Sequence, residues 1–277
     1  MLVDRRTQLS NELTSLLKGY YPQALALTGE KRYAPLALAF LERWPELEAL
    51  SKVRPATLRA FYHRHQVRRP ELIAGRLERV RTARPLTGER ALVEVSILEM
   101  QALVAELRLL EKHIAKLARE IDAQFAAHPE AALFKNLPGA GAAMAPRLSV
   151  LFGADRERWP SAAHLQNYCG ISPVTEKSGR QQWVHWRWNA PLFARQTLVE
   201  WAGLTVKYSA WARAYYEQQK KRQRSHAAIL RSLAFKWLRI LWRCWQDRIP
   251  YDEPRYLARL KKRHPVLFAL ISAPATQ

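Results

Sequence analysis

Ser178 lies in the stretch KSGR, where two cations and a glycine surround a hydroxyl group. A serine hydroxyl has a high pKa, so it needs a base, a metal ion or a strong positive field before it can attack. Lys177 and Arg180 could orient a phosphodiester and stabilise its extra negative charge, while Gly179 would let a nucleic-acid backbone approach closely. These residue types suit a nucleophile for DNA strand transfer, although on their own they favour an ordinary solvated turn.

Other catalytic patterns are missing from the sequence. It contains no Walker loop, no H-E-x-x-H pair, no G-x-S-x-G elbow and no zinc quartet, and no set of carboxylates suits two metal ions. Asp252 and Glu253 are adjacent, so their side chains diverge on any regular element, and we expect a turn or a helix cap there. We therefore expect this chain to bind no metal ion or cofactor by itself.

The composition indicates a polyanionic partner. The 277 residues carry a formal net charge of +21, which exceeds what folding needs and favours nucleic acid over a membrane surface. No run of about 18 apolar residues is present, and the N-terminus has no apolar signal core. Two cysteines far apart form neither a disulfide framework nor a zinc pattern, so we expect a cytoplasmic protein.

The positive charge is concentrated in two regions. Residues 51–90 carry a net charge of +8 and residues 201–277 a net charge of +12, whereas residues 91–130 carry −3. Within the second region we expect four cations to contact phosphates: Lys220, Lys221, Arg222 and Arg224. The aromatic residues just before them could stack on bases, but helix core is the favoured interpretation: Tyr208, Trp211, Tyr215 and Tyr216.

Two further segments could contact a nucleic-acid backbone. The stretch LPGAG joins two apolar helices in the manner of a helix-hairpin-helix turn, in which Gly139 and Gly141 permit a tight bend and free N–H groups can hold a phosphate. A purely structural turn is the alternative. The stretch QWVHWRW, residues 182–188, alternates with period two and predicts a short strand with Trp186 on one face and Arg187, a further candidate contact, on the other.

The remaining pattern is helical, which predicts a mainly α fold with one small β element at 181–188. Prolines divide residues 1–88 into short helices, and residues 89–128 form one long helix without proline or glycine. Its apolar residues follow a heptad pattern typical of a coiled coil, with packing on the chain's own core as the alternative. The pattern consists of Val93, Met100, Leu107, Ile114 and Ile121, with Leu103, Leu110 and Leu117 between them. Residues 129–277 then form a second, helical domain.

Several motifs resemble, in order, those of the IS-one-ten family of insertion-sequence transposases. They are LFKNLPGAGAAMAPRL, GISPVTEKSGR, WARAYY, LAFKWLRILWRCW and PYDEPRYL, and the segment DRRTQLSNELTSLLKGYYPQAL resembles the part that follows the family's N-terminal catalytic domain. The resemblance covers essentially the whole chain. It implies a recombinase that cuts and rejoins DNA under the guidance of a bridge RNA, with residues 129–277 as its Tnp domain and Ser178 as its nucleophile.

The sequence also departs from the family's pattern in one respect. Family members have an N-terminal RuvC-like domain with an Asp-Glu-Asp-Asp metal site, which would precede Met1 here, so Mg²⁺ is expected only in that missing domain. We therefore expect this chain to bind double-stranded element ends and target DNA, and a guide RNA, but to cut poorly alone. The coiled coil is expected to form a homodimer or tetramer.

Two other interpretations stay open. The first is a catalytically incomplete nucleic-acid-binding dimer that regulates or complements the full-length transposase. The second is a structural helical protein whose excess of positive charge is incidental. Substitution of Ser178 separates the first from a recombinase, and the salt dependence of binding separates the second from both.

Overall fold

The computed structural model describes residues 1–185 and 187–272 and is mainly helical, as the sequence predicts, with one two-stranded antiparallel sheet in the described part. The chain divides into two compact units, Met1–Glu120 and Ile121–Gln277. None of the helices in the described ranges combines the length and the hydrophobicity that a membrane span requires. Trp186, which the sequence places in the strand, lies outside the described residues.

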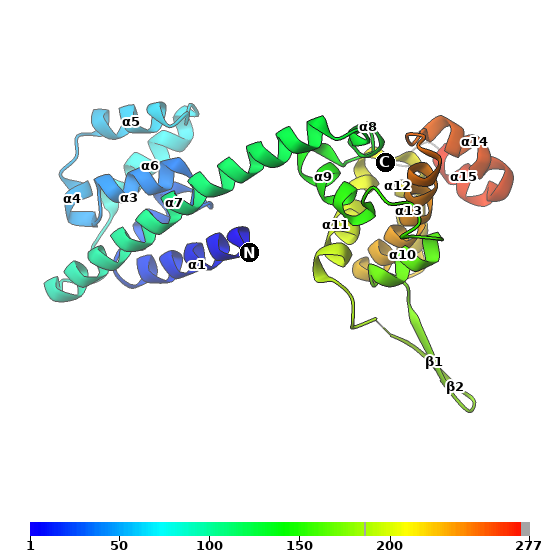
Figure 1. Ribbon diagram of the computed structural model, residues 1–277. Coiled ribbons are helices and arrows are strands. Elements are labelled where there is room, and N and C mark those ends of the chain that lie inside the picture. The colour runs from blue at the N-terminus through cyan, green and yellow to red at the C-terminus, as the bar shows by residue number, and fades with distance from the viewer. Residues whose placement is uncertain (186, 273–277) are drawn as a thin grey trace. The chain divides into compact units, whose positions relative to one another are not determined.

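The first unit consists of short helices and most of one long helix (Figure 1). Prolines occupy the first position of α3, α5 and α6, where their fixed φ suits a helix start and their missing N–H costs nothing. The sequence therefore separates these helices at its prolines, as expected. In order, the helices are α1 (Leu2–Tyr20), α2 (Gln23–Thr28), α3 (Pro35–Arg43), α4 (Leu47–Ser51), α5 (Pro55–Arg64), α6 (Pro70–Thr82) and α7 (Arg90–Ala127).

The heptad pattern of α7 is used in two different ways. Met100, Leu103 and Leu107 are buried in the core of the first unit, so this part of the helix packs on its own domain. Further along, Leu117 and Ile121 leave about half of their side-chain surfaces exposed. Only this later part of the pattern is therefore free for the predicted coiled coil.

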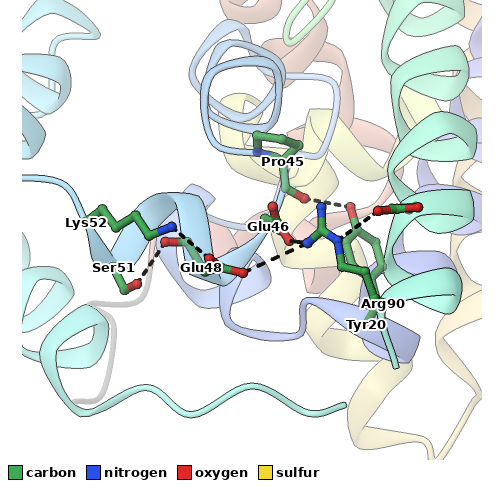
Figure 2. Close-up of polar contacts among 8 residues, drawn as sticks. Tyr20, Pro45, Glu46, Glu48, Ser51, Lys52 and Arg90 are labelled. Carbon is green, nitrogen blue, oxygen red and sulfur yellow. Dashed lines mark hydrogen bonds and ion pairs between the residues drawn. The ribbon is translucent and has the colours of Figure 1, made fainter. Parts of the chain in front are cut away.

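Ion pairs join the elements of the first unit. Arg90, the first residue of α7, contacts Glu46 at 2.8 Å and Glu94 at 2.9 Å, and a weaker contact of 3.9 Å reaches Glu48, which also pairs with Lys52 (Figure 2). Beside this network, the Tyr20 hydroxyl donates a hydrogen bond to the Pro45 carbonyl oxygen at 2.9 Å (Figure 2). Carboxylates of this unit therefore pair with Arg90 and Lys52 and join the start of α7 to α4 and the residue before it.

The second unit adds helices around a hairpin. Its elements are α8 (Ala131–Lys135), α9 (Gly141–Phe152), α10 (Ala162–Tyr168), β1 (Val174–Ser178), β2 (Gln181–His185), α11 (Leu192–Tyr208), α12 (Ala210–Lys221), α13 (His226–Asp247), α14 (Glu253–Arg263) and α15 (Pro265–Ser272). As expected, Asp252 caps a helix, because its side chain accepts a hydrogen bond from the backbone N–H of Arg255 at 2.8 Å.

Tryptophans form the centre of the second core. Trp237 is fully buried, with its ring centroid 5.0 Å from that of Trp201 and 4.6 Å from that of Trp211. Its indole N–H donates to the hydroxyl of Thr205 at 2.8 Å, so this buried N–H has a hydrogen-bond partner. Trp211 and Tyr215 are buried as well, which agrees with helix core as the favoured interpretation, whereas Tyr208 remains 66% exposed.

Candidate nucleophile and cationic surface

The KSGR stretch forms the tip of the hairpin. β1 and β2 pair so that Ser178 lies opposite Gln181, which leaves only Gly179 and Arg180 in the loop. Gly179 has a φ of +57°, and a positive φ at the first of two loop residues is the pattern of a type II′ turn, which matches the twist of paired strands. Figure 1 shows the hairpin extending away from the helices of its unit, with the tip farthest from them.

The tip is open to approach. Lys177, Ser178, Gly179 and Arg180 are all exposed, and a Cβ atom added to Gly179 would meet no atom within 4 Å. No ion pair to Lys177 or Arg180, and no hydrogen bond to the Ser178 hydroxyl, occurs among the described residues. The hydroxyl and the two charges are therefore available together to a phosphate that arrives from outside.

The sequence alone did not reveal a carboxylate that stabilises the hairpin. Side chains alternate along each strand, so Glu176, Ser178, Trp183 and His185 lie on one face of the hairpin. The Glu176 carboxylate accepts a hydrogen bond from the indole N–H of Trp183 at 3.0 Å and lies 2.7 Å from the imidazole Nε2 of His185. His185 and Trp183 thereby hold the pKa of Glu176 below its usual value of 4.5. In the sequence, the only sign of this pairing was the alternation of side chains along the two strands of the hairpin.

The two glycines of the predicted phosphate-binding turn differ in their surroundings. Both have positive φ values, but a Cβ atom on Gly139 would lie 3.0 Å from the ring of Tyr208 and 3.1 Å from Leu204. Gly139 therefore lets α11 approach closely, which is the structural role. Gly141 begins α9 and faces open space. Figure 1 shows α8 and α9 well away from the hairpin tip, so the turn and Ser178 do not form one site.

The remaining predicted contacts are distributed over two places. Lys220, Lys221, Arg222 and Arg224 are exposed at the end of α12 and in the turn that follows, and no ion pair to them is found in the described ranges. Arg187 is half-buried beyond the end of β2, where its guanidinium reaches the Asn167 side-chain oxygen at 3.5 Å. The first four therefore form a free cationic surface, whereas Arg187 makes a contact within its own unit.

The described residues do not supply a metal site. No group of three or more His, Cys, Asp or Glu side chains is close enough to hold an ion within residues 1–185 and 187–272. The described residues therefore do not fit a Mg²⁺ ion, which the resemblance implies only for a RuvC-like domain, and we derive no step through a metal ion on this chain.

Comparisons with known proteins cover both units. Residues 131–217, which include the hairpin, match a family model described as the transposase IS116/IS110/IS902 family. The chain is 30% identical to the mini-circle putative transposase for IS117 of Streptomyces coelicolor over 92% of its length, and this covers 63% of that protein. It is 27% identical to an IS110 insertion-element protein of 43.6 kDa from Streptomyces coelicolor, over 91% of this chain and 62% of that one.

A third relative is the IS116 insertion-element protein of 44.8 kDa from Streptomyces clavuligerus, at 25% identity over 89% of this chain and 61% of that protein. The chain thus spans somewhat less than two thirds of the length of the curated relatives it matches. The resemblance found in the motifs is confirmed: residues 131–217 match the IS116/IS110/IS902 transposase family model, and the chain is similar over most of its length to insertion-element proteins of that group.

Proposed function

We propose that this chain is the serine-bearing part of an insertion-sequence transposase and acts as a DNA recombinase through Ser178. The observation that carries the proposal is the position of this hydroxyl at an exposed, glycine-containing hairpin tip between Lys177 and Arg180. The region that matches the transposase family model contains the whole hairpin.

The proposed step is a transesterification at phosphorus. The Ser178 oxygen forms a bond to the phosphorus of a DNA phosphodiester, the bond from phosphorus to one sugar oxygen breaks, and that sugar leaves as an alcohol. The serine proton is transferred away and a proton is delivered to the leaving oxygen, so the charge of the phosphodiester is conserved in the serine–DNA linkage. Lys177 and Arg180 stabilise the additional negative charge of the transition state.

The activating group is expected from outside the described residues. A serine hydroxyl needs a base, a metal ion or a strong field, and within the described part of the chain neither a hydrogen-bonded base nor a metal cluster accompanies Ser178. We therefore propose that the chain alone cuts DNA poorly. The additional length of its relatives is where we expect the missing catalytic groups.

The proposed partners are double-stranded DNA at the element ends and target, and a guide RNA. The exposed cations from Lys220 to Arg224 support a polyanionic partner because no carboxylate of the described residues neutralises them. The guide RNA rests on the family resemblance alone. We further propose that protomers pair through the exposed part of α7, where Leu117 and Ile121 continue the heptad pattern.

Covalent capture of DNA tests the nucleophile. The chain is incubated with Mg²⁺, cognate ends and guide RNA, alone and together with the region of an IS117-type relative that it does not span. Protein–DNA adducts are expected in the supplemented reaction only. Ser178→Ala should abolish them, whereas Thr175→Ala, which removes an exposed hydroxyl from the same strand, should not. Adducts that persist in Ser178→Ala would contradict the proposal.

The alternative is a nucleic-acid-binding dimer without strand-transfer activity. The lack of an activating group near Ser178 within the described residues favours it. It predicts that no adduct forms in either reaction, that Ser178→Ala binds DNA as tightly as the unmodified chain, and that adding the chain to a full-length relative changes transposition.

A further inference from the structure

A cavity of about 440 Å³ lies beside the base of the hairpin, at the opposite end from Ser178. One wall comes from the hairpin and the segment before it, and the other comes from α13, with Tyr215 of α12 between them. The lining residues are Ile171, Ser172, Pro173, Val184, His185, Tyr215, Ala228, Arg231, Ser232, Phe235, Lys236 and Arg239. All of them belong to the second unit.

α13 presents one continuous face to this cavity. Its lining residues recur at intervals of three and four positions from Ala228 to Arg239, which is the spacing of a single helix face. The opposite face carries Leu233, Trp237 and Leu241 into the core. Helical periodicity therefore places Arg231, Lys236 and Arg239 on the cavity face and Trp237 in the core.

Among the described residues, three cations and no carboxylate line the cavity: Arg231, Lys236 and Arg239. Lys236 keeps an exposed surface, its ammonium lies 5.0 Å from the centre of the Tyr215 ring, and partial desolvation together with the charge of Arg239 lowers its pKa. Burial also lowers the pKa of Arg231. Cations that have lost part of their hydration near one another gain free energy when an anion enters, so the cavity favours an anionic ligand.

The remaining lining is apolar and aromatic, so it suits a ligand that carries an apolar group in addition to its negative charge. Ile171, Pro173, Val184, Phe235 and the ring of Tyr215 supply apolar and aromatic surface beside the cations. The volume lies within the range of about 300–1,000 Å³ that is usual for small-molecule sites. A phosphate joined to a flat, partly apolar base satisfies both walls. A base within a duplex is stacked and paired, so it cannot enter without leaving the helix.

We infer that this cavity receives one unpaired nucleotide of a nucleic-acid strand, with its phosphate near Arg231, Lys236 and Arg239 and its base against the apolar wall. The inference rests on the proposed nucleic-acid binding but not on the chemistry of Ser178. It deepens the proposed function because it assigns to the hairpin base a selectivity for single strands, separate from the charge-driven binding of duplex by the cations at the end of α12.

Fluorescence titrations of the Ser178→Ala chain test this, with oligothymidylate, oligouridylate and a hairpin duplex as separate probes. Lys236→Met and Arg239→Gln should each weaken binding of single strands roughly tenfold, with little change for the duplex. Lys236→Arg should restore binding of single strands. The two oligonucleotides show whether DNA or RNA supplies the nucleotide.

Two matched variants serve as controls. Arg243→Gln removes one exposed cation from the same helix outside the cavity and should leave single-strand binding within about twofold of the starting chain. Lys220→Gln removes an exposed cation of the α12 end and should weaken binding of single strands and duplex equally. Arg239 is exposed, so its substitution keeps the test valid if Lys236→Met fails to fold.

Competition with small probes tests the two walls. Thymidine 5′-monophosphate should displace oligothymidylate at lower concentration than either inorganic phosphate or thymidine. Equal competition by phosphate and the nucleotide, or equal losses on duplex and single strands in the cavity variants, would overturn the inference. Binding of single strands in the cavity without any serine–DNA adduct in the capture experiment would leave the inference standing and reject the nucleophile.

Discussion

Several arginines of the first unit pair with carboxylates, whereas the cations at the hairpin tip and at the end of α12 in the second unit do not pair within the described residues. Arg5, Arg6 and Arg108 each reach a glutamate on a distant helix of the first unit. In the second unit, Lys177, Arg180 and the cations from Lys220 to Arg224 make no ion pair among the described residues. The same residue types therefore join helices at some positions, whereas at the hairpin tip and the end of α12 they remain available for a polyanion.

The largest expected effect concerns nucleic-acid affinity. A chain that makes six or more phosphate contacts should lose roughly a thousandfold in duplex affinity between about 50 and 200 mM salt. Replacing Lys220, Lys221, Arg222 and Arg224 by Gln should weaken binding and flatten this slope, because about four counterions fewer are released. The readout is fluorescence anisotropy with duplex DNA at several salt concentrations.

The matched variant replaces Arg5, Arg6, Arg90 and Arg108 of the first unit by Gln. It removes the same number of positive charges, but its charges are already paired, so we expect almost the same salt slope as in the unmodified chain. Equal losses in both variants would contradict the contrast between the units. A flat response in the unmodified chain would favour the structural interpretation of the charge.

The next effect shows whether the two cores are stabilised independently of each other. Trp237→Ala removes a fully buried side chain among three aromatic rings and should destabilise the second unit by about 3–5 kcal/mol. Amide hydrogen exchange should show lost protection in Ile121–Gln277 and unchanged protection in the helices before it. Phe40→Ala, at a fully buried position of the first core, should give the reverse pattern.

A smaller effect should distinguish Gly139, which packs against Tyr208 and Leu204, from Gly141, which faces open space. Ala at either position requires a positive φ and costs about 1–2 kcal/mol, but Gly139→Ala also brings a methyl group against Tyr208 and Leu204. Gly139→Ala should therefore lower the free energy of unfolding more than Gly141→Ala, by urea denaturation. If Gly141→Ala reduces DNA affinity without a further loss of stability, the turn binds phosphate as first predicted.

The smallest effect is the pH dependence of the hairpin. The pKa of Glu176 is lowered in the folded state, so its contact contributes stability above the ordinary glutamate pKa and loses it as the pH falls below about 4.5. Trp183 fluorescence should change over that acidic range in the unmodified chain and not in Glu176→Gln. Identical titrations of the two proteins would show that this carboxylate does not order the hairpin.

Periodic patterns allowed much of the fold to be predicted. Prolines fixed the starts of α3, α5 and α6, and the uninterrupted stretch from residue 89 produced the long α7, because these signals are local. The heptads could not reveal that Met100 and Leu103 pack on the same unit. A helix in a coiled coil and a helix on its own core have the same apolar stripe.

The candidate site was predictable in part. Ser178 and its neighbours were found from residue types and from the family resemblance, but the pairing of Glu176 with His185 depends on strand register, which the sequence does not display. The cavity was missed because its lining joins α13 to a hairpin that lies about fifty residues earlier in the chain.

By itself, the sequence determined the helical class, the charge excess and the family resemblance, because composition, short-range spacing and motif order are properties of the linear chain. Only the tertiary structure decided which cations are neutralised and which stay free. That outcome depends on distances between residues far apart in sequence, such as Arg6 and Glu111, and electrostatic energies depend on those distances.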